Sequence, residues 1–288
     1  MALPVYRAET APLQDPLAIN AKLVADWLVA FLKEECIRRR KVSRAVLGLS
    51  GGVDSAVVAY LAARAFGPEN VLALRMPYKM SSQSSLDDAQ KCIDDLGIVA
   101  KTIPITGMVD GYVEQEKAAG QEVSPQRLGN ICARCRMVVL FDQGAAWNAL
   151  PLGTGNKSER LFGYFTWHAD DSPPINALGD LFKMQVYALA RELGVPDSII
   201  DKPASADLVA GQTDEGDFGI SYARADLILH YLTSGYPKAK LLELRFLPGE
   251  VEIVWRRVST THWKRRLPTV AMLSNSAIGE YYLRPVDY

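Results

Sequence analysis

Cysteine and histidine are scarce in this chain, which has four cysteines and three histidines among 288 residues. So few cysteines in a chain of this length do not form a disulfide framework. No apolar run reaches the roughly 18 residues needed to span a bilayer, and Met1 to Thr10 lack the charged and apolar regions of a signal peptide. The sequence therefore predicts a cytoplasmic protein that does not enter a membrane.

A dominant charge is also missing, because 32 basic and 33 acidic side chains give a formal net charge of −1. This balance provides no general basic footprint, so we expect no nucleic-acid partner. The apolar fraction of 49% and charged fraction of 23% are ordinary for a soluble globular protein. A chain of this length can bury most of its unfolded surface. We expect residues 1–288 to form one domain with helical additions.

Apolar runs alternate with amphipathic segments along the first two thirds of the chain. This alternation predicts parallel strands with right-handed crossovers, and hence a doubly wound α/β sheet flanked by helices. Asp180 is expected to cap the helix that it begins, and residues 162–179 and 203–218 are expected to be loops. The expected strands are 45–49, 71–76, 99–105 and 150–154, and the expected helices are 16–40, 54–66, 84–96, 125–149, 180–193, 221–232 and 250–258.

A glycine-rich turn follows the first expected strand and opens a helix. Its glycines allow close approach of the backbone, and the amides of the turn and of the helix N-terminus point toward an anion. The turn lacks the lysine of the GxxxxGK[ST] loop, so a metal and a lysine from elsewhere would have to balance the phosphate charge. The residues expected to bind the nucleotide here are Gly48, Leu49, Ser50, Gly51, Gly52, Val53, Asp54 and Ser55.

Asp54 is the unusual member of this turn, because a carboxylate repels phosphates. Its position is explained if Mg²⁺ lies between them, since Mg²⁺ typically takes one or two carboxylates together with phosphate oxygens. The simpler alternative is a helix start in which Ser-Gly-Gly precedes the helix and Asp54 lies in its first turn. The complete strand, SGGxDS and helix arrangement favours phosphate binding.

The segment Ser50-Gly51-Gly52-Val53-Asp54-Ser55 resembles the pyrophosphate-binding signature of the adenine nucleotide α-hydrolase-like, or N-type ATP pyrophosphatase, superfamily. Its members share a Rossmann-like sheet, cleave ATP to AMP and pyrophosphate, and adenylate a substrate oxygen. They include NAD synthetases, GMP synthetases, asparagine and argininosuccinate synthetases, and several tRNA-modifying enzymes.

Further segments, in order over roughly residues 20–230, resemble those of the NAD synthetases. These segments are Gly129-Asn130-Ile131-Cys132-Ala133-Arg134-Cys135-Arg136-Met137, Gly153-Thr154-Gly155-Asn156-Lys157-Ser158-Glu159, Gly163-Tyr164-Phe165-Thr166, Leu178-Gly179-Asp180-Leu181-Phe182-Lys183, Ser205-Ala206-Asp207-Leu208, Gly211-Gln212-Thr213-Asp214-Glu215 and Gly219-Ile220-Ser221-Tyr222.

The resemblance implies a role for each matched polar residue. Asp54 and Glu159 would hold Mg²⁺, and Thr154, Lys183 and Ser205 would contact ATP. Asp54 and Lys183 would be the catalytic residues, and Arg134 would bind deamido-NAD. Elementary chemistry agrees for two of them: Lys183 can offset charge on a departing pyrophosphate, and Arg134 suits a phosphate or carboxylate.

The chain departs from the family pattern where deamido-NAD is bound. The family usually has Lys-Tyr-Gly-Asp after its GxFT block, and this chain has Trp167-His168-Ala169-Asp170, with Pro173-Pro174 in place of an expected acid. A His-Lys-Arg block is matched by Trp263-Lys264-Arg265, and His262 is displaced by one residue. The resemblance therefore implies acceptor contacts by Trp167, Asp170, Trp263 and Lys264. Trp167 either stacks on the acceptor or packs within its loop.

The resemblance implies ATP-dependent amidation of deamido-NAD to NAD by way of an acyl adenylate, with release of AMP and pyrophosphate. Only about 45 residues precede the first strand, so we expect no glutaminase domain and free ammonia as the nitrogen donor. Family members are homodimers, which predicts a homodimer here. The alternative is another member of the superfamily, either a GMP synthetase-like enzyme or a tRNA-thiolating enzyme that uses Cys132 and Cys135. Without further metal ligands, these cysteines are interpreted as small helix residues.

Overall fold

Five parallel strands form the centre of the fold, and the computed structural model describes residues 15–205, 213–266, 270–271 and 273. The strand order is β3-β2-β1-β4-β5, and every neighbouring pair is parallel. Because β1 lies between β2 and β4, the order reverses between β1 and β4, which confirms the doubly wound sheet. The strands are β1 (Ala45–Gly48), β2 (Val71–Arg75), β3 (Val99–Thr102), β4 (Leu150–Gly153) and β5 (Ile175–Asn176).

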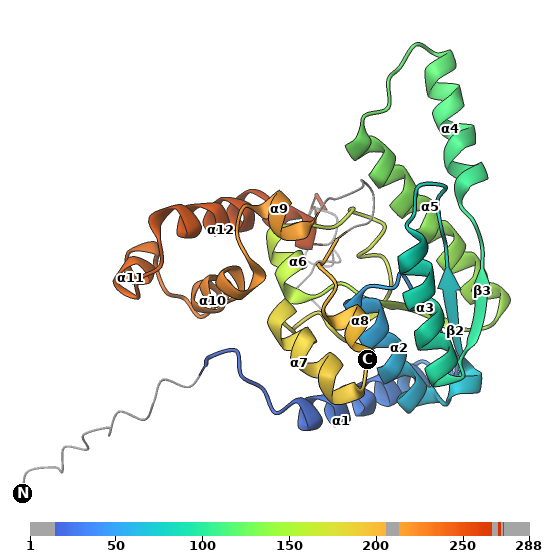
Figure 1. Ribbon diagram of the computed structural model, residues 1–288, viewed down its shortest axis with the longest axis horizontal. Helices are drawn as coiled ribbons and strands as arrows, with labels where there is room; N and C mark the ends of the chain where they lie inside the picture. Colours follow the sequence, from blue (N-terminus) through green and yellow to red (C-terminus); the bar gives the residue numbers. More distant parts are fainter. Residues whose placement is uncertain (1–14, 206–212, 267–269, 272, 274–288) are drawn as a thin grey trace, which may run out of the picture.

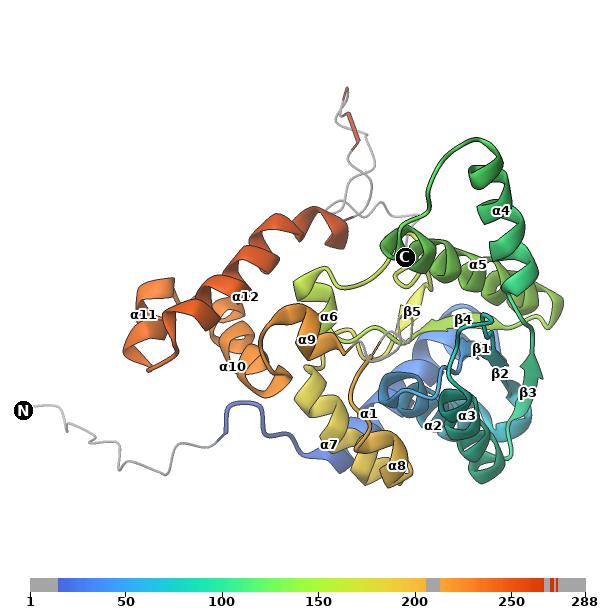
Figure 2. The same cartoon turned by 45° about the horizontal axis from the view of Figure 1, so that its top comes forward.

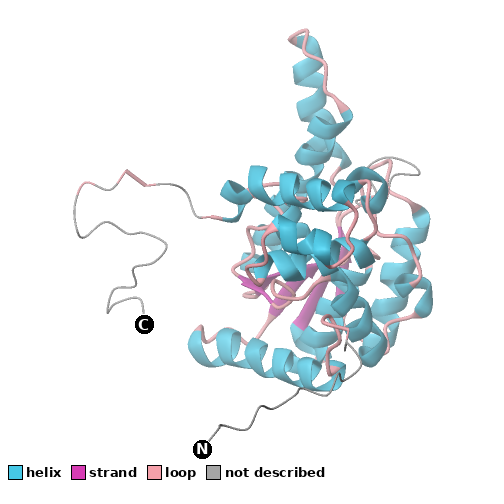
Figure 3. Cartoon of the chain, turned by 90° about the vertical axis from the view of Figure 1, so that its left-hand side faces the viewer, coloured by secondary structure: helices cyan, strands magenta, loops and turns pink. Residues whose placement is uncertain are grey.

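Helices cover both faces of the sheet (Figures 2 and 3). Ala45 and Leu47 of β1 join the apolar cluster under one face, whereas Val46 between them joins the cluster under the other. A strand that is apolar on both faces is what a sandwiched parallel sheet requires. One face is covered by α1 (Ala21–Leu32), α2 (Val53–Phe66), α3 (Gln83–Leu96), α7 (Lys183–Leu193) and α8 (Asp197–Ile200), and the other by α5 (Pro125–Ala146). Helix α4 (Thr106–Ala118) packs against α5 and projects from the molecule (Figure 1).

A group of helices lies beside the sheet, on the side away from α4 and α5 (Figure 1). It has its own apolar cluster, which includes Phe162, Phe218, Tyr222 and Val254. The helices of this group are α6 (Lys157–Phe162), α9 (Asp214–Phe218), α10 (Tyr222–Thr233), α11 (Lys238–Glu243) and α12 (Pro248–Thr260). The short helical segments η1 (Lys33–Arg39), η2 (Pro68–Asn70) and η3 (His262–Arg265) complete the described structure. Within that part of the chain, no helix combines the length and apolar character needed to cross a membrane.

Three expectations about helices and loops were wrong. Helix α7 begins at Lys183 rather than at Asp180, and Asp180 instead pairs with Lys157 at 2.8 Å. The expected loop 162–179 contains β5, and the expected loop 203–218 contains α9. Helices α4, α6 and α11 were not predicted, because each is short or lacks a clear apolar stripe.

Candidate active site

The glycine-rich turn (residues 48–55) lies where β1 ends and α2 begins, next to the reversal of strand order. Four side-chain hydrogen bonds close it, one of them between the hydroxyls of Ser50 and Ser55 at 3.1 Å. The Ser55 hydroxyl accepts from the Ser50 amide at 3.2 Å and donates to the Gly52 carbonyl at 2.9 Å, and the Ser50 hydroxyl accepts from the Gly52 amide at 3.2 Å. Ligands of open α/β sheets bind in the crevice at this reversal. The turn is therefore held in shape where a ligand is expected.

Gly51 explains why the turn must contain glycine. Its φ is +81°, and a Cβ added there would lie 2.1 Å from the carbonyl oxygen of Ser85 in α3. A Cβ on Gly48 would lie 3.1 Å from the Met76 methyl group. The glycines of this turn were expected to allow a ligand to approach the backbone closely. They also allow Met76 and Ser85, which lie on either side of the connection between β2 and α3, to pack against the turn.

Lys183 connects the two acids that the sequence assigned to Mg²⁺. Its ammonium forms an ion pair with Asp54 and lies 3.9 Å from a carboxylate oxygen of Glu159. Asn156 joins the same acids, because its side-chain amide donates to Asp54 at 3.0 Å and its backbone amide donates to Glu159 at 3.1 Å. Residues from α2, α6 and α7 therefore meet at one point beside the glycine-rich turn.

Two aromatic rings and a third acid surround the Lys183 side chain, which is only 2% exposed. Its ammonium lies 5.4 Å from the ring centroid of Tyr222 and 5.8 Å from that of Tyr187. The Tyr222 hydroxyl donates to Asp214 at 3.0 Å, and the other oxygen of that buried carboxylate lacks a hydrogen-bond partner within the described chain. Ring faces attract a cation, so they stabilise the ammonium in this buried position.

The charges of this cluster are strongly coupled. Burial, and next the negative charge of Asp54, raise the pKa of Glu159 to about 8. Burial lowers the pKa of Lys183, but the charges of Asp54 and Glu159 outweigh it and raise the pKa overall. The cluster therefore has more carboxylate than one ammonium can neutralise, and this deficit favours a further cation.

The acids of the cluster fit a magnesium ion that is shared with a nucleotide. Asp54 and Glu159 provide the hard oxygen ligands that Mg²⁺ prefers. Across the described residues, no set of three or more His, Cys, Asp or Glu side chains forms a complete protein cage. Mg²⁺ usually keeps several positions for water and phosphate, so two carboxylates beside a phosphate-binding turn suit it.

The remaining residues expected to contact ATP lie at the edge of this site. Thr154 directly follows β4 and is half-buried. Ser205 is exposed and follows Ala204, whose carbonyl accepts from the Asp214 amide at 2.9 Å. Residues 206–212, which include parts of two of the matched segments and of the expected loop 203–218, lie outside the described residues.

The residues expected to bind the acceptor gather around residues 163–170. The rings of Trp167 and Trp263 meet edge to face with their centroids 5.1 Å apart, and Trp263 is 50% exposed. Arg134 donates to the Trp167 carbonyl at 3.3 Å. The structure thus brings together three residues that are distant in sequence, and the half-buried Trp167 forms an aromatic surface with the more exposed Trp263.

Asp170 and Lys264 make contacts that shape this loop. The Asp170 carboxylate accepts from the Thr166 amide at 2.7 Å. The Lys264 ammonium donates to the Gly163 carbonyl at 2.6 Å and to the Phe165 carbonyl. In this arrangement both side chains hold the loop that would face the acceptor.

Sequence reasoning missed Asn156, Asp214 and Tyr222 as members of the site. Asn156 had a readable signal, because Asn-x-x-Glu marks a helix start, and the structure has a capping box between Asn156 and Glu159. Asp214 and Tyr222 lie in two of the matched segments, but neither was given a role, since only the folded chain brings them to Lys183.

The cysteine pair lies in a buried, apolar part of α5. Cys132 is buried and Cys135 half-buried in α5, where both belong to the apolar packing under the sheet. Burial raises the pKa of each thiol, although nearby Arg136 opposes the shift. Reactive cysteines have lowered pKa values, so this environment does not favour the thiolation alternative.

Comparisons with known proteins identify the family of this chain. A family model described as NAD synthase matches residues 24–268. An NH(3)-dependent NAD(+) synthetase from Chlorobaculum parvum is 44% identical, covering 91% of this chain and 94% of that protein. One from Fusobacterium nucleatum is 43% identical, covering 89% and 98%.

Solved structures extend the likeness to three dimensions. An NMN synthetase from Francisella tularensis superposes with a TM-score of 0.78 at 30% identity, covering 88% of this chain and 99% of that one. An NH3-dependent NAD synthetase from Campylobacter jejuni gives a TM-score of 0.75 at 31% identity, covering 88% and 100%.

Proposed function

The chain belongs to the NAD synthase family, and from this premise we propose that it is a ligase that makes NAD from deamido-NAD, ATP and ammonia. The observation that carries the proposal is the cluster of Asp54, Glu159 and Lys183 beside the glycine-rich turn. The names of the similar proteins from Chlorobaculum parvum and Fusobacterium nucleatum support ammonia as the nitrogen donor.

In the first step, an oxygen of the nicotinate carboxylate attacks the α-phosphorus of ATP. The bond between the α-phosphorus and the bridging oxygen breaks, and pyrophosphate leaves with the electron pair. The amides of the turn and the Lys183 ammonium stabilise the negative charge that develops on the leaving group. Because Lys183 is already held by Asp54, no reorganisation is needed when this charge appears.

In the second step, the nitrogen of ammonia attacks the acyl carbon of the adenylate. The carbon–oxygen bond to AMP then breaks, AMP departs, and the nitrogen loses a proton to give the amide. AMP is a far better leaving group than the oxide of a free carboxylate, which is why ATP is consumed. Water must be kept from the adenylate, and we assign this task to the segments at residues 162–179 and 203–218.

Asp54 and Glu159 would hold Mg²⁺, which when bound would neutralise phosphate charge. A bound cation would favour the ionised form of Glu159, whose pKa burial and Asp54 raise. Asn156, which donates to both acids, would keep them in place.

Arg134, Trp167 and Trp263 would form the acceptor site.

The protein would act as a homodimer. Support for a dimer comes from Val138 and Phe141, which are large, apolar and exposed three residues apart on α5. Residues at this spacing lie on one helix face. Sedimentation velocity at micromolar concentration checks this, and a purely monomeric species would contradict it.

The decisive experiment is product analysis by mass spectrometry after incubation with deamido-NAD, ATP, Mg²⁺ and ammonium. We expect NAD, AMP and pyrophosphate in equal amounts, and no product when ammonium or deamido-NAD is omitted. Formation of AMP without NAD would reject the acceptor, and absence of any ATP cleavage would reject the ligase itself.

A further inference from the structure

The segment that joins β2 to α3 (residues 76–82) and the start of α3 both contact the glycine-rich turn. The Met76 methyl group lies against Gly48, and the carbonyl of Ser85, the third residue of α3, lies against Gly51. A shift of this segment would therefore change the space at the turn. The position of this segment therefore affects how a nucleotide fits against the turn.

Backbone hydrogen bonds fix only part of this segment. The Met76 carbonyl accepts from Arg136 at 3.1 Å, and the Pro77 carbonyl accepts from the Ile105 amide at 3.0 Å. Beyond Pro77, the Ser81 amide donates back to the Tyr78 carbonyl at 2.8 Å, which closes a local turn. That turn fixes its own shape, and the Ser82 hydroxyl, which accepts from the Ser85 amide at 3.2 Å, joins the end of the segment to α3.

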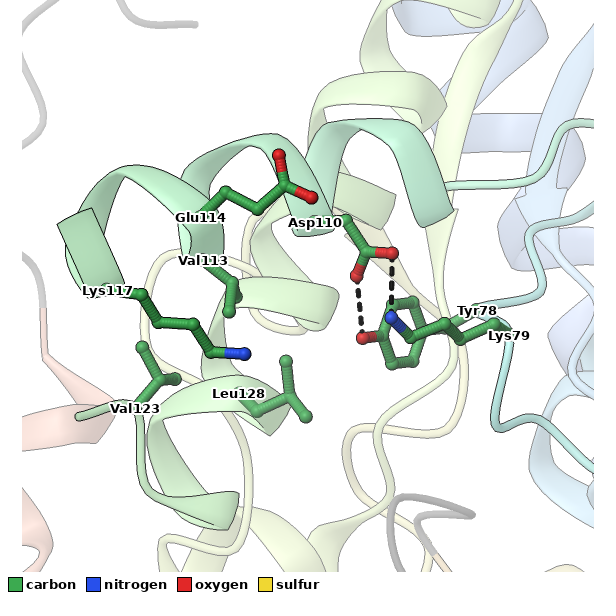
Figure 4. Close-up of a pocket in the computed structure, with 8 residues that line it drawn as sticks. All are labelled: Tyr78, Lys79, Asp110, Val113, Glu114, Lys117, Val123 and Leu128. Atoms are coloured by element: carbon green, nitrogen blue, oxygen red, sulfur yellow. Dashed lines mark hydrogen bonds and ion pairs between the residues drawn. The ribbon is translucent and has the colours of Figure 1, made fainter.

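Asp110 of α4 supplies an attachment through both of its carboxylate oxygens. One oxygen accepts from the Tyr78 hydroxyl at 2.9 Å and the other from the Lys79 ammonium at 2.7 Å (Figure 4). We call these two contacts the Asp110 bridge. A pocket of about 240 Å³ lies beside the bridge, lined on the α4 side by Val113 and Lys117. Tyr78 and Val109 of α4 belong to the same apolar cluster, so the bridge adds polar contacts to this packing.

We propose that Asp110 is a positioning residue for ATP, because it holds residues 76–82 against the glycine-rich turn. The inference rests on the proposed function, since it assumes that the turn binds ATP. The two contacts differ in strength. Tyr78 is only 9% exposed, and its hydroxyl donates to a charged acceptor, whereas the Lys79 side chain is 55% exposed and its ion pair is screened by solvent. The Tyr78 contact is therefore the main one.

The test compares steady-state kinetics of four single variants with the wild type. We expect Asp110→Ala to raise the KM for ATP about tenfold, Tyr78→Phe about fivefold, and Lys79→Met at most about twofold. The KM for ammonium and the kcat should stay within about twofold of wild type. Glu114→Gln is the matched control, because Glu114 lines the same pocket one turn further along α4 and should leave all constants unchanged.

A double variant distinguishes the bridge from general damage. If the bridge acts as described, Tyr78→Phe combined with Asp110→Ala should raise the KM for ATP no more than Asp110→Ala alone, because both remove the same contact. Additive effects would overturn the inference. An equal rise in the KM for every substrate would overturn it too, since that indicates loosened folding rather than positioning of ATP.

The outcomes also separate this inference from the proposed function. If the wild type makes no NAD, the proposed function fails. If the wild type makes NAD and Asp110→Ala leaves the KM for ATP within twofold, the inference alone fails. Should Asp110→Ala not fold, Tyr78→Phe decides, because it removes a single hydroxyl and keeps the buried ring.

Discussion

Lys183 has an unusual environment for a lysine, since its side chain is buried between carboxylates and aromatic rings. A buried ammonium is stable only when it is paired and well placed. Here Asp54 supplies the pair, and the rings of Tyr187 and Tyr222 supply further attraction. The positive charge is thus fixed beside the glycine-rich turn before any nucleotide arrives.

Replacing Lys183 by methionine should lower kcat for NAD formation about 100-fold or more, because the leaving pyrophosphate loses a preorganised positive charge. Initial rates with saturating ATP measure this, and circular dichroism checks that the variant is folded. Lys240→Met is the control, since Lys240 is an exposed lysine that pairs with Glu243 on α11. A folded Lys183→Met enzyme with more than a tenth of the wild-type rate would contradict the role of Lys183.

The buried carboxyl of Asp226 leads to a prediction about the stability of the fold and not about the reaction rate. It is fully buried, and it accepts from the Ser158 hydroxyl at 2.5 Å and the Met184 amide at 2.9 Å. Burial, opposed by these hydrogen bonds, raises its pKa from 3.8 to about 6. The folded state therefore holds the proton more tightly than the unfolded state, so the contribution of Asp226 is most favourable below pH 3.8 and is lost as pH rises to 6.

In wild type this loss should amount to at most about 3 kcal/mol of unfolding free energy between pH 4 and 7. Asp226→Asn should flatten that part of the profile, because an amide does not titrate. Urea denaturation at several pH values measures the effect, with Asp26→Asn as an exposed control. Identical pH profiles for wild type and Asp226→Asn would show that the buried carboxyl is not the cause.

At the scale of elements, the sequence predicted the helices and strands whose pattern lies within one short stretch of the chain. β1 and α2 were predicted because an apolar run, a glycine-rich turn and an uninterrupted helix follow one another. β5 was missed because its two residues form a strand only by pairing with β4. The start of α7 was misplaced because Asp180 is a typical cap, yet it pairs with Lys157 of α6. Tertiary contacts, which a local pattern does not contain, decided both.

Two helix ends offer a matched comparison. Gly97 ends α3 and Gly163 ends α6, each with φ of +63°. A Cβ at Gly97 would meet nothing within 4 Å, whereas one at Gly163 would lie 2.4 Å from the Thr261 side chain. Alanine at Gly97 should cost about 1 kcal/mol for the left-handed backbone alone, and alanine at Gly163 about 3 kcal/mol, because the clash adds to it.

Chemical denaturation of both alanine variants measures this difference. Gly163→Ala should also reduce NAD formation, because the Gly163 carbonyl accepts from Lys264 in the loop that would face the acceptor. Gly97→Ala should leave the rate unchanged. Equal stability losses in the two variants would mean that α6 and the residues after α12 are not tightly packed together.

At the scale of the whole molecule, the site is assembled from residues far apart in sequence. Asp54, Glu159 and Lys183 could be chosen from the sequence because each lies in a matched segment, and the structure brings these three together. The arrangement of Asp54 and Glu159 around the Lys183 ammonium could not be foreseen from the sequence. It depends on α2, α6 and α7 meeting beside the reversal of strand order. Asp214 and Tyr222 also lie in matched segments, but they come from the helical group beside the sheet, and their contact with Lys183 became visible only in the folded chain.

The fold alone does not select the acceptor, because solved structures named as an NMN synthetase and as an NAD synthetase superpose almost equally well on this chain. The edge-to-face pair of Trp167 and Trp263 offers an aromatic surface beside Arg134. Stacking of a base on such a surface is worth roughly 1–3 kcal/mol. A dinucleotide can use this surface in addition to the contacts of its nicotinate half, and we therefore expect kcat/KM for deamido-NAD to exceed that for nicotinate mononucleotide by about tenfold to 100-fold.

Parallel assays with the two acceptors test this preference, and Trp263→Ala should reduce it by lowering kcat/KM for deamido-NAD alone. Trp255→Ala is the matched control, because Trp255 is a half-exposed tryptophan on α12 that lies near Lys238 rather than Trp167. If Trp263→Ala lowers kcat/KM by the same factor for both acceptors, Trp263 acts by packing against the loop and not by binding the dinucleotide. Equal kcat/KM values in the wild type would mean that the adenylate half of the dinucleotide makes no productive contact with the protein.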